Sequence, residues 1–225
     1  MNCHVQITQS LLVLLNINML SIEKSFLFIE LPKTGSTSIC SVLEKYSKNI
    51  QPKKHITPLQ LKRFNKLHNI RLSELFKFTF VRNPFDRLVS AFLYDINMYN
   101  YRPLPERERL FHLYGANGKP GAEEFKSFVR NDLNRVMQRV FFYREQICWS
   151  LEYDFVGRYE RINIDYEQVC NRINIPVEGL PWLNNNNKPH YSTFYTDTET
   201  IEVVADLYRR DLNRYNYTFD DKRPT

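Results

Sequence analysis

The apolar residues of this chain form short continuous runs, each followed by apolar residues at the spacing of a helix. Residues 26–31 (FLFIEL) and 76–81 (FKFTFV) are typical of buried strands. The helix expected after the first run carries on one face Ile39, Val42, Leu43 and Tyr46. The helix expected after the second carries Phe85, Leu88, Val89 and Phe92. Residues 153–159 and 160–173 repeat the pattern, which predicts an α/β domain of three layers around a central parallel sheet.

The loop after the first strand, PKTGSTS at residues 32–38, combines the features of a phosphate cradle. Gly35 lets the backbone turn sharply and approach a ligand closely. The N–H groups of residues 35–38 would point out of the helix start, where the helix dipole also favours an anion. The candidate phosphate-binding residues are Lys33, Thr34, Gly35, Ser36, Thr37 and Ser38. Because Lys33 precedes Gly35, this is not a Walker GxxxxGK(S/T) loop, and an ordinary turn with a Ser/Thr helix cap is an equal alternative.

A second candidate anion site follows the second strand. Arg82 leaves the end of that strand, and Ser90 comes eight residues later, inside the expected helix. If the two strands are parallel neighbours, both side chains face the same crevice as Lys33, at the carboxyl ends of the sheet. The alternative is that Arg82 forms an ion pair with Asp86 and that Ser90 is a small packed residue.

These two motifs together resemble those of a known family. PKTGSTS followed by FVRNPFDRLVSAF looks like the sulfotransferases, in particular the branch with heparan sulfate 2-O-sulfotransferases, chondroitin sulfotransferases and small bacterial relatives. A weaker resemblance continues through residues 153–170 and 183–219. The resemblance implies a P-loop-like sulfotransferase fold. It also implies sulfuryl transfer from the co-substrate PAPS (3′-phosphoadenosine 5′-phosphosulfate) to a hydroxyl, of a carbohydrate or another acceptor.

The resemblance also assigns roles to residues. The first loop would bind the 5′-phosphosulfate, with Lys33 neutralising charge on the leaving phosphate oxygen. Arg82 and Ser90 would bind the 3′-phosphate. Lys188 and Tyr191 lie in a loop that closes over the nucleotide in the resembling proteins. Those proteins often carry HWxPQ where this chain has FFYREQ, so Phe142 stands in the position of a histidine.

His55 matches the position of the proposed general base in the heparan sulfate 2-O-sulfotransferases. An imidazole can accept the proton that a sugar hydroxyl loses as it attacks sulfur. The alternative is a solvated loop histidine, because His55 directly follows Lys53 and Lys54.

Composition and charge narrow the classes of ligand. The chain has 225 residues and a net charge of +6, which favours anionic ligands. The basic residues are dispersed, so nucleic acid is not an expected partner. The four cysteines are far apart, without a CxxC or His cluster, and no carboxylate cluster is evident, so neither disulfides nor a metal site are expected.

The expected organisation is one domain over residues 26–219, an N-terminal extension over 1–25 packed on it, and a tail over 220–225. LLVLLNINML at residues 11–20 is too short and too broken by asparagine to span a bilayer, and a packed N-terminal helix is expected there. We therefore expect a cytoplasmic protein without an integral membrane span. Peripheral membrane association, or a Golgi location for a longer chain, is the alternative.

Two further expectations concern the chain's end and its function. A last helix over residues 197–215 is expected to begin with a capping box formed by Thr196 and Glu199.

The alternative to an enzyme is a non-catalytic protein on the same fold that binds a nucleotide or an acidic glycan. The substitution at Phe142 keeps that alternative open.

Overall fold

The computed structural model describes residues 19–47, 66, 71–98, 105–116, 118, 120–149, 152–181, 183 and 189–220. The chain divides into two compact units. The first unit combines the chain up to Val81 with Cys148–Leu183, and the second combines Arg82–Ile147 with Asn184–Pro224. The predicted domain boundaries remain predictions.

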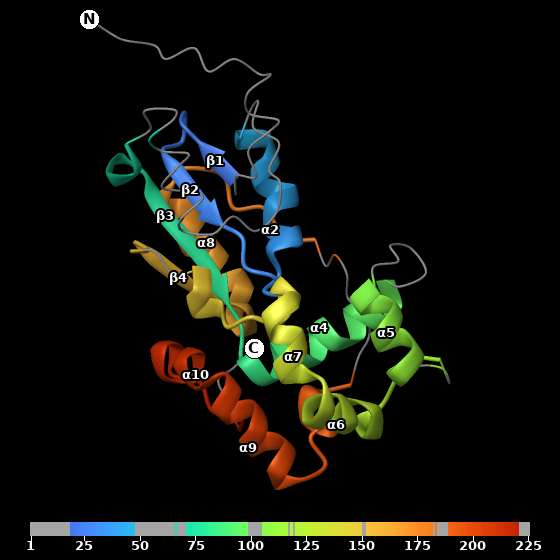
Figure 1. The fold of residues 1–225 in the computed structure, drawn as a ribbon. Coiled ribbons are helices and arrows are strands. Elements are labelled where there is room, and N and C mark those ends of the chain that lie inside the picture. The colour runs from blue at the N-terminus through green and yellow to red at the C-terminus, as the bar shows by residue number, and fades with distance from the viewer. Residues whose placement is uncertain are drawn as a thin grey trace, which may run out of the picture. The chain divides into compact units, whose positions relative to one another are not determined.

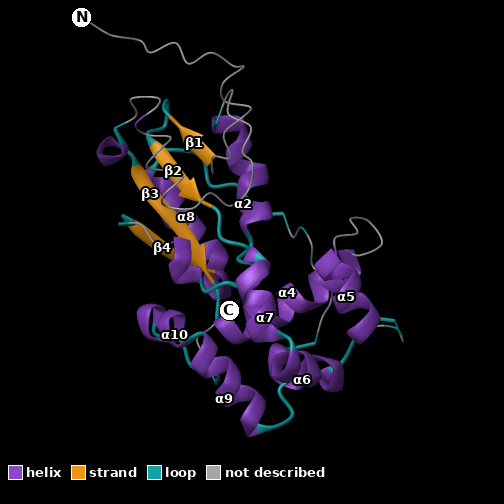
Figure 2. Cartoon of the chain, in the orientation of Figure 1, coloured by secondary structure: helices purple, strands orange, loops and turns teal. Residues whose placement is uncertain are grey.

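The first unit is built on a sheet of four strands in the order β1-β2-β3-β4 (Figures 1 and 2). The strands are β1 (Met19–Ser21), β2 (Phe26–Ile29), β3 (Phe76–Val81) and β4 (Phe155–Arg158). β2, β3 and β4 are parallel neighbours, as the sequence predicted, whereas β1 runs antiparallel to β2. The α/β class is therefore confirmed, with a mixed rather than a purely parallel sheet. The three-layer arrangement stays a prediction.

Two helices complete the core of the first unit: α2 (Ser36–Leu43) and α8 (Ile162–Arg172). Side chains of both helices share one buried cluster with alternate residues of β2 and β3, namely Phe26, Phe28, Phe78 and Phe80. The residues between them on β2, Leu27 and Ile29, are buried as well. Burial on both faces of the strand explains why β2 reads as a continuous apolar run instead of an alternating one. Short 3₁₀ turns lie at Glu44–Tyr46, Leu72–Glu74 and Tyr159–Arg161.

The second unit is helical around an aromatic core. Its α-helices are α4 (Pro84–Met98), α5 (Pro105–Tyr114), α6 (Ala122–Asn131), α7 (Leu133–Arg139), α9 (Thr198–Leu207) and α10 (Arg209–Tyr215) (Figure 1). Short 3₁₀ turns lie at Phe141–Tyr143 and Tyr191–Phe194, and a further one, Gln146–Trp149, contains the last residues of the Arg82–Ile147 segment and the first residues of Cys148–Leu183, which belong to the first unit. Phe92 of α4 stacks on Phe128 of α6 with ring centroids 4.9 Å apart, and Phe125 packs edge-on against both Phe92 and Tyr195. These contacts fix α4, whose first residues carry the second candidate site.

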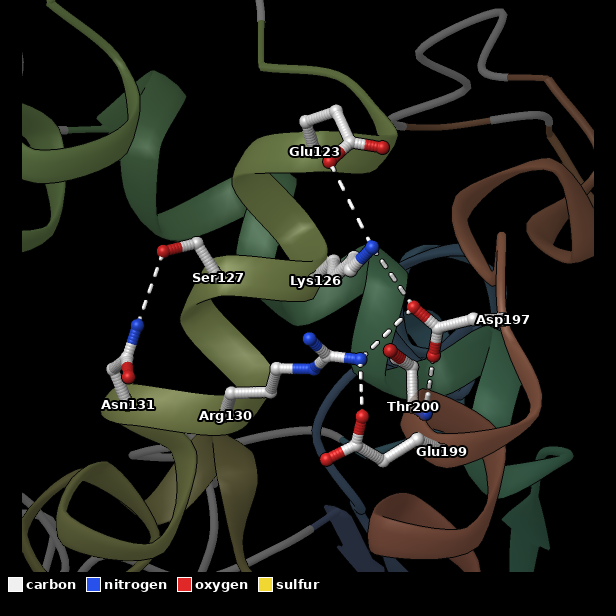
Figure 3. A network of polar contacts seen from close by, with 8 residues as sticks. All are labelled: Glu123, Lys126, Ser127, Arg130, Asn131, Asp197, Glu199 and Thr200. Atoms are coloured by element: carbon white, nitrogen blue, oxygen red, sulfur yellow. Dashed lines mark hydrogen bonds and ion pairs between the residues drawn. The ribbon is translucent and has the colours of Figure 1, made fainter.

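The last helix differs from the prediction in two ways. It is divided at Tyr208 into α9 and α10, and its N-cap is Asp197 instead of Thr196. Asp197 accepts the N–H of Thr200 and forms ion pairs with Lys126 and Arg130 of α6 (Figure 3). The Thr200 hydrogen bond and the Lys126 ion pair hold the pKa of Asp197 well below its usual range. The predicted capping box at Thr196 is therefore wrong. The ion pairs of Asp197 with α6, a helix distant in sequence, could not be predicted from the local pattern.

The N-terminal segment agrees with the prediction only in part. Most of the expected helix falls on residues outside those described, and its last two residues, Met19 and Leu20, form a strand instead. β1 joins β2 through a turn in which Ser25 donates its N–H to the carbonyl of Ile22. Within the described part of the chain, every helix is too short or too polar to span a bilayer.

Candidate functional site

The first loop lies between β2 and α2 and turns through two left-handed residues. Lys33 has φ 67° and Gly35 has φ 81°. Gly35 is itself the N-cap of α2, and no side chain caps the helix. The alternative of a Ser/Thr cap is therefore wrong, and the helix start is left to backbone N–H groups. Those first N–H groups have no acceptor within a helix, which is the condition for anion binding.

The side chains of the loop alternate in exposure. Thr34, Ser36 and Ser38 are buried, whereas Lys33, Gly35 and Thr37 are half-buried and reach the surface. Thr34 donates its hydroxyl to the carbonyl of Leu31 at 3.0 Å, so it braces the turn from inside. The N–H of Ser38 is donated to the carbonyl of Gly35 at 3.1 Å, so the expectation that it points out of the helix is wrong. Lys33, Gly35 and Thr37 remain as the surface-facing candidates.

The backbone of Gly35 is pressed against the segment that follows β4. A Cβ atom at Gly35 would lie 2.7 Å from Cδ1 of Ile162 and 3.1 Å from Cδ2 of Tyr159. The first distance is shorter than van der Waals contact allows, and the positive φ adds strain for any other residue. The conformation of the loop is therefore maintained by packing against Tyr159 and Ile162 as well as by its own turn.

Gly35→Ala is expected to lower the free energy of unfolding by about 2–4 kcal/mol, because left-handed strain and overpacking add. The measurement is denaturant unfolding. The matched variant is Gly35→Ala combined with Ile162→Val, which removes the Cδ1 atom that the new methyl group would strike. It should recover part of the loss, although Ile162→Val alone costs about 0.5–1.5 kcal/mol. If the loss of unfolding free energy in the double variant equals the sum of the losses in the two single variants, Ile162 does not confine the loop.

The second candidate site lies at the start of α4, in the second unit. Nε and Nη2 of Arg82 both lie 2.7 Å from Oδ2 of Asp86, and the side chain of Arg82 is 6% exposed. The predicted alternative ion pair is thus confirmed. The ion pair with Asp86 fixes the direction of the guanidinium. Ser90 lies two turns into α4 and is half-buried.

The backbone around Arg82 is also held by side chains. Asn83 accepts the N–H of Phe85 and so caps the helix, and its amide donates to the carbonyl of Thr218 at 2.9 Å. Gln146 forms two hydrogen bonds with the backbone of Arg82 and is itself held by Asp211. Gln146 and Asp211 were not predicted from the sequence. The one signal was that FFYREQ keeps the glutamine of HWxPQ.

The other predicted residues divide into two groups. His55 and Lys188 lie outside the described residues. Tyr191 is 8% exposed and donates its hydroxyl to the carbonyl of Phe219, so its side chain serves the fold of the second unit. Phe142, in the position of a histidine in the resembling proteins, is half-buried and packs edge-on against the ring of Tyr94.

The described residues include no group of three or more His, Cys, Asp or Glu side chains arranged to hold a metal ion. The cationic side chains that both loops present, Lys33 and Arg82, suit an anionic ligand. Lys33 belongs to the first unit and Arg82 to the second. Each loop is thus a separate candidate anion site that directly follows a parallel strand.

Comparison with known proteins gives a family match and several relatives. The sulfotransferase family matches residues 19–218, which include both loops. Human carbohydrate sulfotransferase 14 is 33% identical over 117 residues, covering 47% of this chain and 31% of that protein. Human carbohydrate sulfotransferase 9 is 25% identical over 235 residues, covering 87% of this chain and 52% of that protein. The chain thus spans about a third to a half of these relatives' length. No solved structure gives a significant match.

Proposed function

Since the chain belongs to the sulfotransferase family, we propose that it transfers a sulfuryl group from PAPS to a hydroxyl group of a carbohydrate. The observation that carries the proposal is the glycine-capped start of α2, where no side chain caps the backbone N–H groups. The names of the carbohydrate sulfotransferases that resemble this chain support the acceptor class.

The proposed reaction is a displacement at sulfur. The acceptor oxygen forms a bond to sulfur while the bond from sulfur to the 5′-phosphate oxygen breaks. The products are a sulfate ester and 3′,5′-ADP, and the hydroxyl proton passes to a base, for which His55 is the proposed residue. Negative charge develops on the departing phosphate oxygen, where a fixed cation stabilises the transition state more than the ground state.

We assign the binding roles as follows. Lys33 neutralises the departing oxygen, and the N–H groups at the start of α2 hold the 5′-phosphate. Arg82 binds the 3′-phosphate, with its guanidinium oriented from the Nε edge by Asp86. Ser90 adds a hydroxyl donor from the same helix. A 3′-phosphate distinguishes PAPS from ATP, so Arg82 is the specificity residue in this assignment.

Arg82→Ala is expected to weaken binding of 3′,5′-ADP by roughly 1.5–3 kcal/mol and to leave 5′-AMP binding nearly unchanged. Only the former nucleotide carries the 3′-phosphate that a charged hydrogen bond would hold. Isothermal titration calorimetry with both nucleotides measures the difference, and it requires no knowledge of the acceptor.

Two controls make that titration specific. Arg209→Ala removes a guanidinium whose side chain is 70% exposed and should change neither affinity. Arg82→Ala combined with Asp86→Asn removes both charges, so the carboxylate left behind cannot cause the loss. Equal weakening for 3′,5′-ADP and 5′-AMP would remove Arg82 from the 3′-phosphate site.

A non-catalytic protein that binds a nucleotide or an acidic glycan is the second candidate. The observation that favours it is Phe142, whose ring packs against Tyr94 where the resembling proteins carry a histidine. Transfer of labelled sulfate from PAPS to a panel of glycans separates the two candidates, because a binder would release no 3′,5′-ADP. A third interpretation, a phosphate-transferring nucleotide enzyme, is disfavoured because the first loop lacks a Walker lysine. A separate comparison of PAPS, ATP and GTP binding tests it.

A further inference from the structure

We propose that Gln146 is a positioning residue that sets the backbone of Arg82 and thereby the recognition of the 3′-phosphate. This inference rests on the proposed function and names a residue outside the two loops that determines the specificity of the second.

The two shortest hydrogen bonds of the Gln146 side chain both go to the backbone of Arg82. Its side chain is fully buried, Oε1 accepts the N–H of Arg82 at 2.8 Å, and Nε2 donates to the carbonyl of Arg82 at 2.9 Å. An amide side chain that pairs with both backbone groups of one residue fixes that residue as a neighbouring strand would. Arg82 comes after the last residue of β3 and two residues before α4, so neither element supplies these partners.

Asp211 of α10 holds Gln146 in turn. The carboxylate is fully buried and accepts the N–H of Gln146 at 2.6 Å and the N–H of Ile147 at 2.8 Å. Burial raises the pKa of Asp211, while the nearby Arg87 guanidinium and the two N–H donors favour the carboxylate. The anchor thus joins α10 to the start of α4 through one glutamine.

The segment around Gln146 has other anchors, so the side chain of Gln146 is not needed to hold it. Arg87 donates to the carbonyls of Phe142 and Arg144, and Tyr208 donates to the carbonyl of Tyr143. These bonds and those of Asp211 act on the backbone of the segment. The amide of Gln146 acts instead on Arg82, with a weaker contact of 3.4 Å to Asp211.

Arg82 is consequently fixed at both ends. Gln146 sets its backbone, and Asp86 sets the direction of its guanidinium. Charge-assisted hydrogen bonds between a guanidinium and a phosphate depend on distance and angle, so a shift of the Arg82 backbone would weaken them. Removing the amide of Gln146 should therefore weaken 3′-phosphate binding while the charge of Arg82 remains.

The test is Gln146→Met, which keeps the side-chain volume without the two hydrogen bonds. Calorimetry should show a loss of affinity for 3′,5′-ADP about 3–10-fold greater than for 5′-AMP. In an Arg82→Ala background the same substitution should cause no further change in the ratio of the two affinities, because residues that act through one another are not additive.

Tyr208→Phe is the matched control. It removes the hydroxyl that holds Tyr143 and should lower thermal stability without changing the affinity ratio. If Gln146→Met does not fold, Gln146→Asn takes its place, since it shortens the side chain by one methylene and keeps its polarity. The same expectation applies to it.

The outcomes separate the inference from the proposed function. A parent protein that binds 3′,5′-ADP no better than 5′-AMP overturns the proposed function and the inference with it. A parent that prefers 3′,5′-ADP, together with an unchanged preference in the Gln146 variant, overturns the inference alone. A change of the same size in the Arg82→Ala background also overturns it, because Gln146 would then act by another route.

Discussion

Lys33→Ala is expected to lower the rate of sulfuryl transfer by about 10²–10³-fold, the usual cost of losing one group that stabilises transition-state charge. Affinity for 3′,5′-ADP should fall much less, because the proposed role of the ammonium is to meet charge that develops during the reaction. Steady-state kinetics with PAPS and calorimetry with 3′,5′-ADP measure the two effects separately.

The backbone of Lys33 supplies an independent argument. Its φ of 67° is unusual for a residue with a side chain and costs about 1–2 kcal/mol relative to glycine. Non-glycine residues with a positive φ are enriched at functional sites, and in this chain Ser25, Asn174 and Asn216 adopt the same conformation in turns or at a helix end. Lys33→Gly should therefore be at least as stable as the parent protein and nearly inactive.

Two results would change this assignment. Lys33→Arg keeps the positive charge and should retain more activity than Lys33→Ala, although its planar group places the charge differently. A Lys33→Ala variant with normal turnover and only poorer PAPS binding would make Lys33 a binding residue instead of a catalytic one.

Three strands could be predicted from the sequence: β2, which is buried throughout, β3, which is buried along its last four residues, and β4, which is mostly half-buried. β2 and β3 read as apolar runs because their neighbours are parallel strands and packed helices. β1 has three residues and lies at the edge of the sheet, so its apolar residues matched a helix equally well. The division of the last helix at Tyr208 likewise left no mark in the spacing of apolar residues.

The candidate site could be predicted to the extent that its parts are local in sequence. Gly35 and Lys33 carry their own signal, because a tight turn before a helix needs residue types that are evident from the sequence. Asp211 carries no such signal, and Gln146 carries only its match to the glutamine of HWxPQ, since they lie 129 and 64 positions from Arg82 and act through buried hydrogen bonds. Nothing in the spacing of polar residues indicates which of them a folded chain brings together.

His55→Ala is expected to lower sulfuryl transfer by about 10²–10⁴-fold, the usual contribution of a general base, and to leave folding and 3′,5′-ADP binding unchanged. His55 lies outside the described residues, so its role is argued from its position between the two phosphate motifs and from its neighbours. Lys53 and Lys54 precede it directly in the sequence, and positive charges close to an imidazole disfavour its imidazolium form. The acidic limb of the pH–rate profile should disappear in the variant.

His190 is the matched control, because the structure gives it a different task. Its Nδ1 atom accepts the N–H of Ser192 and caps the 3₁₀ turn Tyr191–Phe194. The same Nδ1 atom lies 2.8 Å from the hydroxyl oxygen of Ser192, so this side of the imidazole is engaged in the turn. His190→Ala should keep the acidic limb of the profile and most of the turnover.

The comparison of the two histidine variants decides which residue receives the proton. Loss of the acidic limb in His55→Ala alone, with unchanged 3′,5′-ADP affinity, identifies His55 as the base. A His55→Ala enzyme that keeps most of its activity refutes the assignment. His55 would then be the solvated loop histidine of the alternative interpretation. The base would next be sought among the carboxylates of residues 95–134, which the resemblance associates with the acceptor.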